Sequence, residues 1–223
     1  MSDRFLAASR TLGSVASEHK AVLVAYSGGK DSLAVLDLCA RSFRRVVCFF
    51  MYFVPGLECV ETQLDYARRK WGVEIIQYPH WVFCRCIKHG AYRTPGRLDA
   101  ALMDVKLADV YALARADSGL DIIATGAKRS DGIWRRRNMA QTAHHADIIY
   151  PIKAWNKFDV LAYLKTHDIP IPDSSGRSAT GIDLSTPSLL WLHDNYPEDF
   201  RRLCEYFPFA EAAIWRRQWH GVQ

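Results

Sequence analysis

Residues 21–32 read AVLVAYSGGKDS, and this stretch decides the fold. Its first part, Ala21–Ala25, is an apolar run typical of a β-strand that is covered on both faces. The glycine pair Gly28 and Gly29 follows, and a helix-forming run then extends over residues 33–40. The stretch therefore predicts a strand, a tight turn and the start of a helix.

The predicted turn offers a place for an anion. The first N–H groups of a helix have no partner within the helix, and the helix dipole adds positive potential there. Gly28 and Gly29 remove side chains that would keep a phosphate away from the backbone. The other residues of the turn add a charge, two hydroxyl groups and a carboxylate suited to Mg²⁺ on phosphate oxygens: Lys30, Ser27, Ser32 and Asp31.

The spacing of this turn excludes a Walker P-loop, which needs a glycine, four further residues and then Gly-Lys-Ser/Thr. Position 24 is valine, and an aspartate follows the lysine. The segment instead resembles the Ser-Gly-Gly-x-Asp-Ser loop of the ATP pyrophosphatase (PP-loop) superfamily. That resemblance implies that residues 26–32, Tyr26 included, hold the pyrophosphate end of an adenine nucleotide. It also implies cleavage of ATP between its α and β phosphates.

Strands and helices alternate along the first 170 residues. Apolar runs predict strands at 22–26, 45–52, 73–78, 120–125 and 148–152. Helices are expected at 3–19, 33–40, 57–71, 98–112 and 156–167, whereas the stretch 79–96 is expected to be irregular. We therefore predict an α/β fold, with an open, mostly parallel five-stranded sheet and helices on both faces.

The character of the chain changes after Pro170. Residues 171–187 are rich in loop-forming residues, and apolar side chains in 188–220 predict two or three short helices. We expect a nucleotide-binding domain at 1–170, and at 171–223 a loop and a helical C-terminal extension packed on it. The tail Trp215-Arg216-Arg217-Gln218-Trp219 interleaves aromatic and basic residues. We expect this tail to be a helix that packs its tryptophans and exposes its arginines.

A basic loop follows the predicted strand at 120–125. It begins Thr125-Gly126-Ala127-Lys128-Arg129 and continues to three arginines at 135–137, so five basic residues fall within ten positions, against one Asp131. Arginine forks suit phosphate or sulfate oxygens, although a solvated basic loop is the alternative. Because ligands of open α/β sheets sit at the carboxyl ends of the strands, this loop is expected to face the glycine turn across one cleft.

The candidate site residues follow from these two loops and from the end of the second strand. Catalytic candidates are those that would stabilise charge on a phosphate: Lys30, Asp31, Lys128 and Arg129. The remaining nucleotide-binding candidates are Tyr26, Ser27, Gly28, Gly29, Ser32, Met51, Gly126, Arg135 and Arg137.

Three stretches together resemble the PAPS (phosphoadenosine phosphosulfate) reductase-like family of the PP-loop superfamily. They are Ser27–Ser32, the loop at 125–129 with its later arginines, and Pro151–Val160, in which Asn156 is expected to cap a helix. The chain departs from the family at residues 50–56, which lack the usual Asp-Thr-Gly. It also lacks the Glu-Cys-Gly tail of the reductases.

Cys204 is the one cysteine of the C-terminal tail. The neighbouring Arg201 and Arg202 offer a way to lower its pKa, but we favour a core position beside Leu203 and Phe207 on an amphipathic helix. The close pair Cys84 and Cys86 lacks the spacing of a zinc or cluster site, so no iron–sulfur cluster is expected.

Composition and net charge indicate which partners and which cellular location to expect for the protein. The 223 residues carry a net charge of +5, which suits an anionic small-molecule substrate and also nucleic acid, the less favoured partner. The first residues do not resemble a signal peptide, and no apolar run reaches the ~18 residues of a membrane span. We therefore expect a cytoplasmic protein without a membrane partner; the sequence does not indicate its oligomeric state.

Three functions compete at this point. The first is an enzyme that cleaves or transfers at the α phosphate of ATP or a related adenine nucleotide, with release of pyrophosphate. The second is a thiol-dependent sulfonucleotide reductase that uses Cys204. The third is a non-catalytic nucleotide- or nucleic-acid-associated module, for which the aromatic and basic tail would be the contact.

Overall fold

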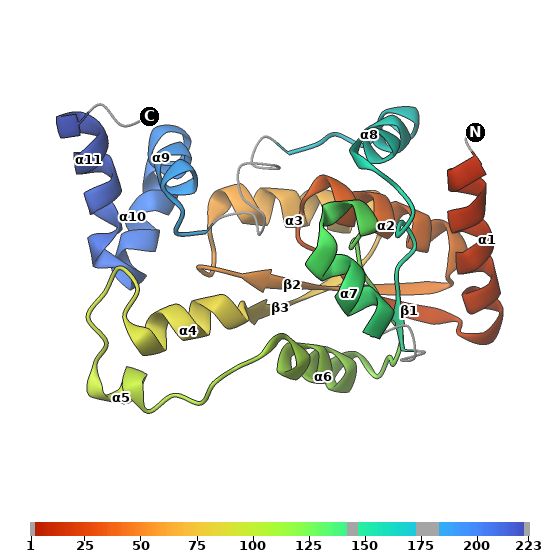
Figure 1. Ribbon diagram of the computed structural model, residues 1–223, viewed down its shortest axis with the longest axis horizontal. Helices are drawn as coiled ribbons and strands as arrows, with labels where there is room; N and C mark the ends of the chain where they lie inside the picture. Colours follow the sequence, from red (N-terminus) through yellow and green to blue (C-terminus); the bar gives the residue numbers. More distant parts are fainter. Residues whose placement is uncertain (1–2, 142–146, 173–182, 221–223) are drawn as a thin grey trace.

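The structure is a computed structural model that describes residues 3–141, 147–172 and 183–220. Part of the predicted loop at 171–187 thus lies outside the described residues. Within them, five strands form one parallel sheet in the order β3-β2-β1-β4-β5, and Figure 1 labels the first three of these strands. The strands are β1 (Ala21–Ala25), β2 (Arg45–Tyr52), β3 (Glu74–Pro79), β4 (Ile123–Ala124) and β5 (Ile148–Ile149). The predicted α/β fold is confirmed, although β4 and β5 are shorter than predicted.

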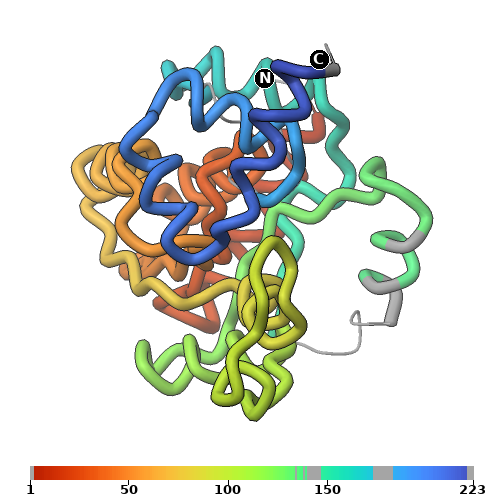
Figure 2. Tube along the Cα trace, turned by 90° about the vertical axis from the view of Figure 1, so that its left-hand side faces the viewer, coloured from red at the N-terminus to blue at the C-terminus, as the bar shows by residue number. Residues whose placement is uncertain are grey.

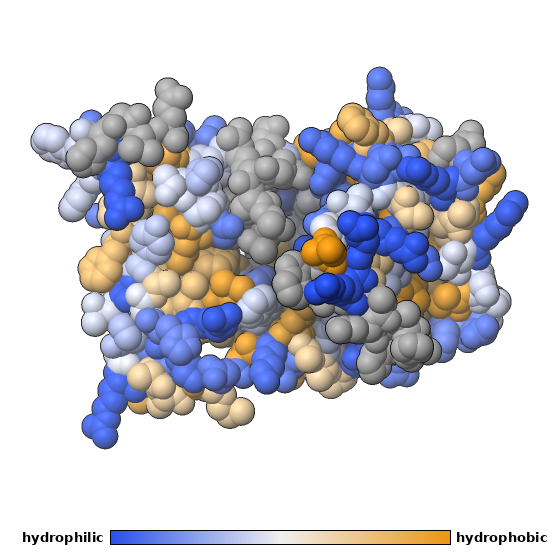
Figure 3. Space-filling model, in the orientation of Figure 1, coloured by the Kyte–Doolittle hydropathy of each residue, from blue (hydrophilic) through white to orange (hydrophobic). Residues whose placement is uncertain are grey.

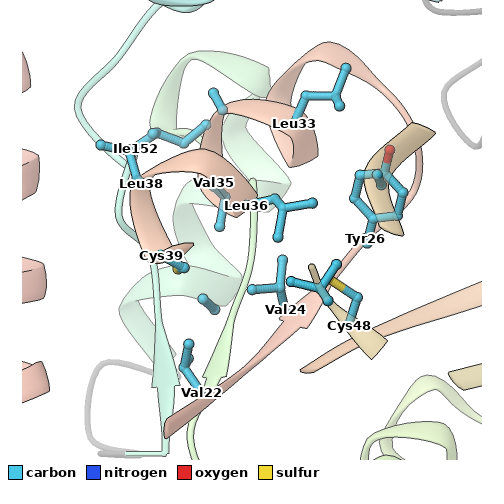
Figure 4. Packing of buried hydrophobic residues seen from close by; sticks show 14 of the residues in the cluster. Val22, Val24, Tyr26, Leu33, Val35, Leu36, Leu38, Cys39, Cys48 and Ile152 are labelled. Atoms are coloured by element: carbon cyan, nitrogen blue, oxygen red, sulfur yellow. The ribbon is translucent and has the colours of Figure 1, made fainter. Parts of the chain in front are cut away.

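Helices cover both faces of the sheet. One face packs against α1 (Asp3–Glu18), α2 (Lys30–Ser42), α3 (Glu58–Trp71) and α8 (Lys157–Thr166). The other face packs against α6 (Leu107–Ser118). Figure 4 shows the first layer, in which Val22 and Val24 of β1 lie below Leu36 and Cys39 of α2. Alternate residues of β1 therefore face opposite layers, with Leu23 in the core on the α6 side.

Asp37 ties three helices of the first layer together. This buried carboxylate of α2 accepts hydrogen bonds from Arg41 (2.7 and 3.3 Å), from the indole of Trp71 in α3 (3.0 Å) and from the hydroxyl of Tyr163 in α8 (2.7 Å). Burial would raise the pKa of Asp37, but these hydrogen bonds outweigh it and lower the pKa. The carboxylate is therefore held in its charged form.

The C-terminal helices pack at the end of the sheet toward which the strands point. They are α9 (Thr186–Asn195), α10 (Pro197–Tyr206), η3 (Pro208–Glu211) and α11 (Ala212–His220), on the left of Figure 1. Their apolar side chains share a second core, here called the C-terminal core, with Phe53, Val54 and Leu57, which follow β2. In addition, Asp199 of α10 accepts hydrogen bonds from the first backbone N–H groups of α3, at 2.7 and 2.9 Å. The extension is thus packed on the sheet region; the domain boundary at residue 170 stays a prediction.

Two helix predictions are wrong. The stretch predicted to be irregular contains α4 (Trp81–His89), which His80 caps through its Nδ1 and which Gly90 ends with φ +80°. The helix predicted at 98–112 is instead α5 (Arg97–Ala100) and α6, because Asp109 accepts from the Lys106 N–H (2.8 Å) and starts α6 at Leu107. The apolar residues at 98 and 102 are accordingly exposed.

The expected orientation of the C-terminal tail is also wrong. Trp215 and Trp219 of α11 are 61% and 82% exposed, whereas Arg217 is only partly exposed and pairs with Asp194 of α9. The helix instead buries Ala213 and Ile214 in the C-terminal core. Small and aliphatic residues thus fill the space that the tryptophans were expected to occupy. Nowhere in the described residues is a helix both long and apolar enough to span a bilayer.

Candidate nucleotide site

The glycine loop, residues 26–32, has the predicted strand–turn–helix form. Gly28 has φ +73°, a left-handed conformation that glycine adopts most readily, and a Cβ there would lie 2.8 Å from Oε1 of Gln63 in α3. Gly29 is the N-cap of α2, and no side chain caps the helix. The start of α2 is therefore available to an anion in the way a phosphate site requires.

The two serines of the glycine loop have different roles. The buried Ser32 hydroxyl accepts from the N–H and the hydroxyl of Ser27, both at 3.2 Å, and donates to the Gly29 carbonyl at 2.9 Å. Its hydrogen bonds thus hold the turn in shape. Ser27 is exposed, so its hydroxyl is the one that a ligand can reach.

The basic loop meets the glycine loop where the strand order reverses. β1 continues to β2 on one side of the sheet and has β4 on the other, which is the crevice where open α/β sheets bind ligands. After β4, a Cβ at Gly126 would lie 3.1 Å from the carbonyl carbon of Asp31. Such a contact is tighter than ordinary packing, so a side chain at position 126 would push the two loops apart by a few tenths of an ångström.

Lys128 joins the two loops by ion pairs. Its side chain is only 3% exposed, and Nζ lies 2.7 Å from Oδ2 of Asp31 and 3.0 Å from Oδ1 of Asp131. Lys30 reaches the same oxygen of Asp31 at 3.0 Å. These four residues are called the Lys128 cluster below. Lys128 thus lies at the predicted site, but it is buried against carboxylates and does not line an open surface.

The Asp31 carboxylate fits a role as a magnesium ligand in part. Its Oδ2 is held by two lysines, while its Oδ1 is buried and accepts no hydrogen bond in the described part of the chain. An unused carboxylate oxygen next to a phosphate position suits Mg²⁺, which takes one or two carboxylates and completes its shell with phosphates and water. In the described residues, no group of three or more acidic, histidine or cysteine side chains is placed to hold a metal ion, at Asp31 or at any other position.

The arginines of the basic loop do not lie in a loop as predicted. Arg129 begins a 3₁₀ turn, η1 (Arg129–Asp131), and its backbone N–H donates to the Lys153 carbonyl at 3.0 Å. Arg135 and Arg137 belong to a helix, α7 (Ile133–Gln141), and all three arginines are exposed. Figure 3 shows hydrophilic residues beside a hydrophobic patch where Figure 1 draws α7, the helix in which Ile133 is exposed. These residues therefore form an exposed basic surface that starts next to the Lys128 cluster and continues along α7.

Met51 and Tyr26 lie at the ends of their strands. Met51 of β2 pairs with Tyr78 of β3, is partly exposed and packs on the α6 side of the sheet. Tyr26 is buried beside α2, and its hydroxyl has no hydrogen-bond partner in the described residues. Burial, followed by the charges of Cys48 and Tyr66, raises the pKa of Tyr26. Tyr26 therefore supports the glycine loop from within the core, whereas Met51 is partly exposed and stays a predicted binding residue.

Cys204 lacks the environment of a reactive thiol. It lies on α10, where burial, followed by the charge of Glu211, raises its pKa to about 11. The arginines expected to lower this pKa bind elsewhere, because Arg201 pairs with Glu198 and Arg202 donates to the Gly56 carbonyl. Activation by these arginines, the alternative to the favoured core position, is thus not supported, and Cys204 packs partly buried against the C-terminal core.

Two residues at the site were not predicted. Asp131 holds Lys128, and the spacing of three residues between them is a signal that could have indicated the pair. Gln63 of α3 lies against Gly28, and no local sequence pattern points to it, because only the packing of α3 brings it there.

A hollow of about 160 Å³ opens away from these residues, between the segment after β2 and α10. Charged side chains line most of it, among them Glu58, Asp199 and Arg202. The Asp199 carboxylate already accepts a hydrogen bond from the first N–H of α3, and the Arg202 guanidinium donates to the Gly56 carbonyl. We therefore assign the hollow to the joint between sheet and extension.

Some solved structures are similar to this chain. Among solved structures, an NH3-dependent NAD synthetase from Campylobacter jejuni, in complex with a nitrate ion, is similar over 99% of this chain and 96% of its own, with 13% identity and a TM-score of 0.50. A phosphoadenylyl-sulfate reductase from Candida auris, in a phosphate complex, shows 14% identity over 74% of this chain and 82% of its own, with a TM-score of 0.48. At these identities the first likeness supports the fold alone.

A search of curated protein sequences found no match. The family profile described as the phosphoadenosine phosphosulfate reductase domain, in contrast, matches residues 21–173, more than half of the chain. That match spans the glycine loop, the Lys128 cluster and the whole of α8. The chain therefore belongs to the phosphoadenosine phosphosulfate reductase domain family, a group of adenine-nucleotide enzymes within the PP-loop superfamily.

Proposed function

We propose that the chain cleaves ATP or a related adenine nucleotide at the α phosphate and adenylates an acceptor. A nucleophilic atom of the acceptor forms a bond to the α phosphorus, the bond to the bridging oxygen breaks, and pyrophosphate leaves. The second substrate would be a small anionic molecule. The observation that supports this best is the close approach of Gly126 to Asp31. It brings the basic loop to the glycine loop at the point where the strand order of the sheet reverses.

The glycine loop would bind the pyrophosphate end of the nucleotide. The uncapped start of α2 and the exposed Ser27 hydroxyl provide donors, and the positive end of the helix dipole favours anions. Lys30 is partly exposed and would move from Asp31 to a phosphate oxygen. Mg²⁺, when bound beside Asp31, would neutralise phosphate charge.

The remaining cations would meet the rest of the phosphate charge. The Lys128 cluster contains two lysines and two aspartates, so its formal charges cancel. Bound phosphates therefore need further positive charge, which the exposed Arg129, Arg135 and Arg137 can supply from the neighbouring surface. In this arrangement Lys128 positions Asp31, while the arginines contact the nucleotide.

The test uses ATP labelled at the α phosphate, with Mg²⁺ and with or without small anionic acceptors. We expect labelled AMP or an adenylated acceptor together with pyrophosphate. Lys30→Ala and Asp31→Ala should each weaken nucleotide binding or turnover by about tenfold or more, because each removes a charge-assisted contact. Lys165→Ala, on the exposed side of α8, is the matched control and should change neither. ADP and phosphate as products, or unaltered titrations for both loop variants, would contradict the proposal.

A second candidate is a thiol-dependent sulfonucleotide reductase, which the family match favours. The Cys204 thiolate would attack the sulfur of a sulfonucleotide, a thiosulfonate would form on Cys204, and the nucleotide phosphate would leave. A dithiol would then reduce the adduct and release sulfite. The raised pKa of Cys204 opposes this route, because almost all of the thiol is protonated at neutral pH. Nucleotide binding without turnover in either assay would instead favour the non-catalytic module.

A further inference from the structure

One face of helix α11 packs against the C-terminal core and α9. Ala213 and Ile214 are 3% and 5% exposed within that core. Arg217, one turn further along, donates to both oxygens of Asp194 in α9, at 2.5 and 2.8 Å. Residues three and four apart share a side of a helix, so these three residues define the attached face. Arg217 is therefore engaged in holding α11 to α9.

The opposite face of α11 carries two tryptophans that packing does not explain. Trp215 and Trp219 are 61% and 82% exposed and lie one turn apart. At 100° per residue, their mean direction points away from the attached face. Figure 1 draws α11 as the outermost helix of the extension, and this end of the molecule faces the viewer in Figure 2. Two large, rigid aromatic rings thus stand next to each other in solvent.

The charges around these rings favour a polyanion as the partner. Within Ala212–His220 there is no acidic residue, and Arg216 is exposed beside the tryptophans. Asp194 is already paired with Arg217. Glu211, which directly precedes the helix, is exposed and is the one carboxylate of residues 206–220, where Arg216 and Arg217 outnumber it. The whole chain carries a net charge of +5.

We propose that the face of α11 formed by Trp215, Arg216 and Trp219 binds single-stranded nucleic acid. Successive bases would stack on the two indole rings, and Arg216 would contact the phosphate between them. Exposed aromatic rings beside a cation are the usual means of binding single strands without sequence preference, because every base has a π-face. This surface is separate from the nucleotide site, so the inference does not depend on the proposed reaction.

The test is fluorescence anisotropy with a labelled single-stranded DNA of mixed sequence, about 12 nucleotides long, and with RNA of the same sequence, in the absence of ATP. The double variant Trp215→Ala/Trp219→Ala should bind the single strands at least about tenfold more weakly than the natural protein. Arg216→Gln should weaken binding at low salt and reduce the salt dependence by about one phosphate contact. Phe158→Ala, which removes an exposed aromatic ring on α8, is the control and should bind normally.

Several outcomes would overturn the inference. The natural protein could bind no oligonucleotide at low salt, or the double tryptophan variant could bind the oligonucleotide with the same affinity as the natural protein. Stronger binding to duplex than to single strands would also overturn it, because duplex bases are not open to stacking. Sedimentation that shows dimers only in the natural protein would assign the face to a second copy instead. Far-UV circular dichroism and thermal unfolding of each variant confirm that a loss of binding is not a loss of fold.

Discussion

Replacement of Lys128 by methionine tests whether this ion pair holds the two loops together. Methionine keeps most of the buried side-chain length but leaves Asp31 and Asp131 without the ammonium that lies 2.7 and 3.0 Å from them. Removing one partner of a fully buried pair costs about 3–5 kcal/mol. Here the carboxylates are 26% and 29% exposed, so water solvates them in part. We therefore expect a loss of about 2–3 kcal/mol in the free energy of unfolding.

Urea unfolding followed by circular dichroism measures this loss, which corresponds to a melting temperature roughly 4–12 °C lower. Lys153→Met is the matched control, because it removes an exposed lysine near the same loop and should change stability by less than about 0.5 kcal/mol. Adding Asp131→Asn to Lys128→Met should recover part of the loss, since it removes one of the uncompensated charges. If Lys128→Met is as stable as Lys153→Met, the buried lysine does not hold the loops and the reasoning is refuted.

Two further predictions concern Asp37 and Cys204. Asp37→Ala leaves donors on Arg41, Trp71 and Tyr163 without their acceptor and should cost about 3 kcal/mol in urea unfolding. Because the pKa of Asp37 is lowered in the fold, its contribution is present above the unfolded pKa of about 4 and is lost as the pH falls through the lower folded pKa. An unchanged acid-unfolding curve for Asp37→Ala would disprove this. Cys204→Ser should keep adenylation activity, whereas a thiosulfonate adduct on Cys204 in a mass spectrum would favour the reductase.

The sequence predicts those parts of the fold that depend on local pattern. The apolar strand, the glycine pair and the helix-forming run at 21–40 specify one conformation each, and the structure has all three. The Asn156 cap is another example, since its side chain accepts from the N–H groups of Phe158 and Asp159 as the spacing indicates. Local chemistry decides these features, so no knowledge of the tertiary structure is needed to find them.

Features that depend on tertiary packing were missed. Packing against α9 decides which side of α11 is buried. Ala213 and Ile214 fit into the C-terminal core there, while Trp215 remains exposed. Likewise, a lysine in a basic loop is normally solvated, so the sequence gives no sign that Lys128 is buried. Its burial follows from Asp31, which comes from a loop that is distant in sequence. Helix α4 was missed because its apolar side pairs with residues after β2 and in the C-terminal helices.

The pairing register between β1 and β4 determines which residues of the glycine loop and the basic loop meet at the site. Leu23 pairs with Ile123 and Val24 with Ala124, in parallel, so the segments that follow the two strands leave the sheet at the same level. Gly126 then follows Ala124 by two residues and reaches the backbone of Asp31, and Lys128 follows Gly126 by two more and reaches its carboxylate. A shift of one residue would turn the next side chain toward Asp31 and move Lys128 about 3 Å along the strand direction, beyond ion-pair distance. The short pairing between β1 and β4 therefore matters more for the candidate site than any single charged residue in it, because it decides which charges meet.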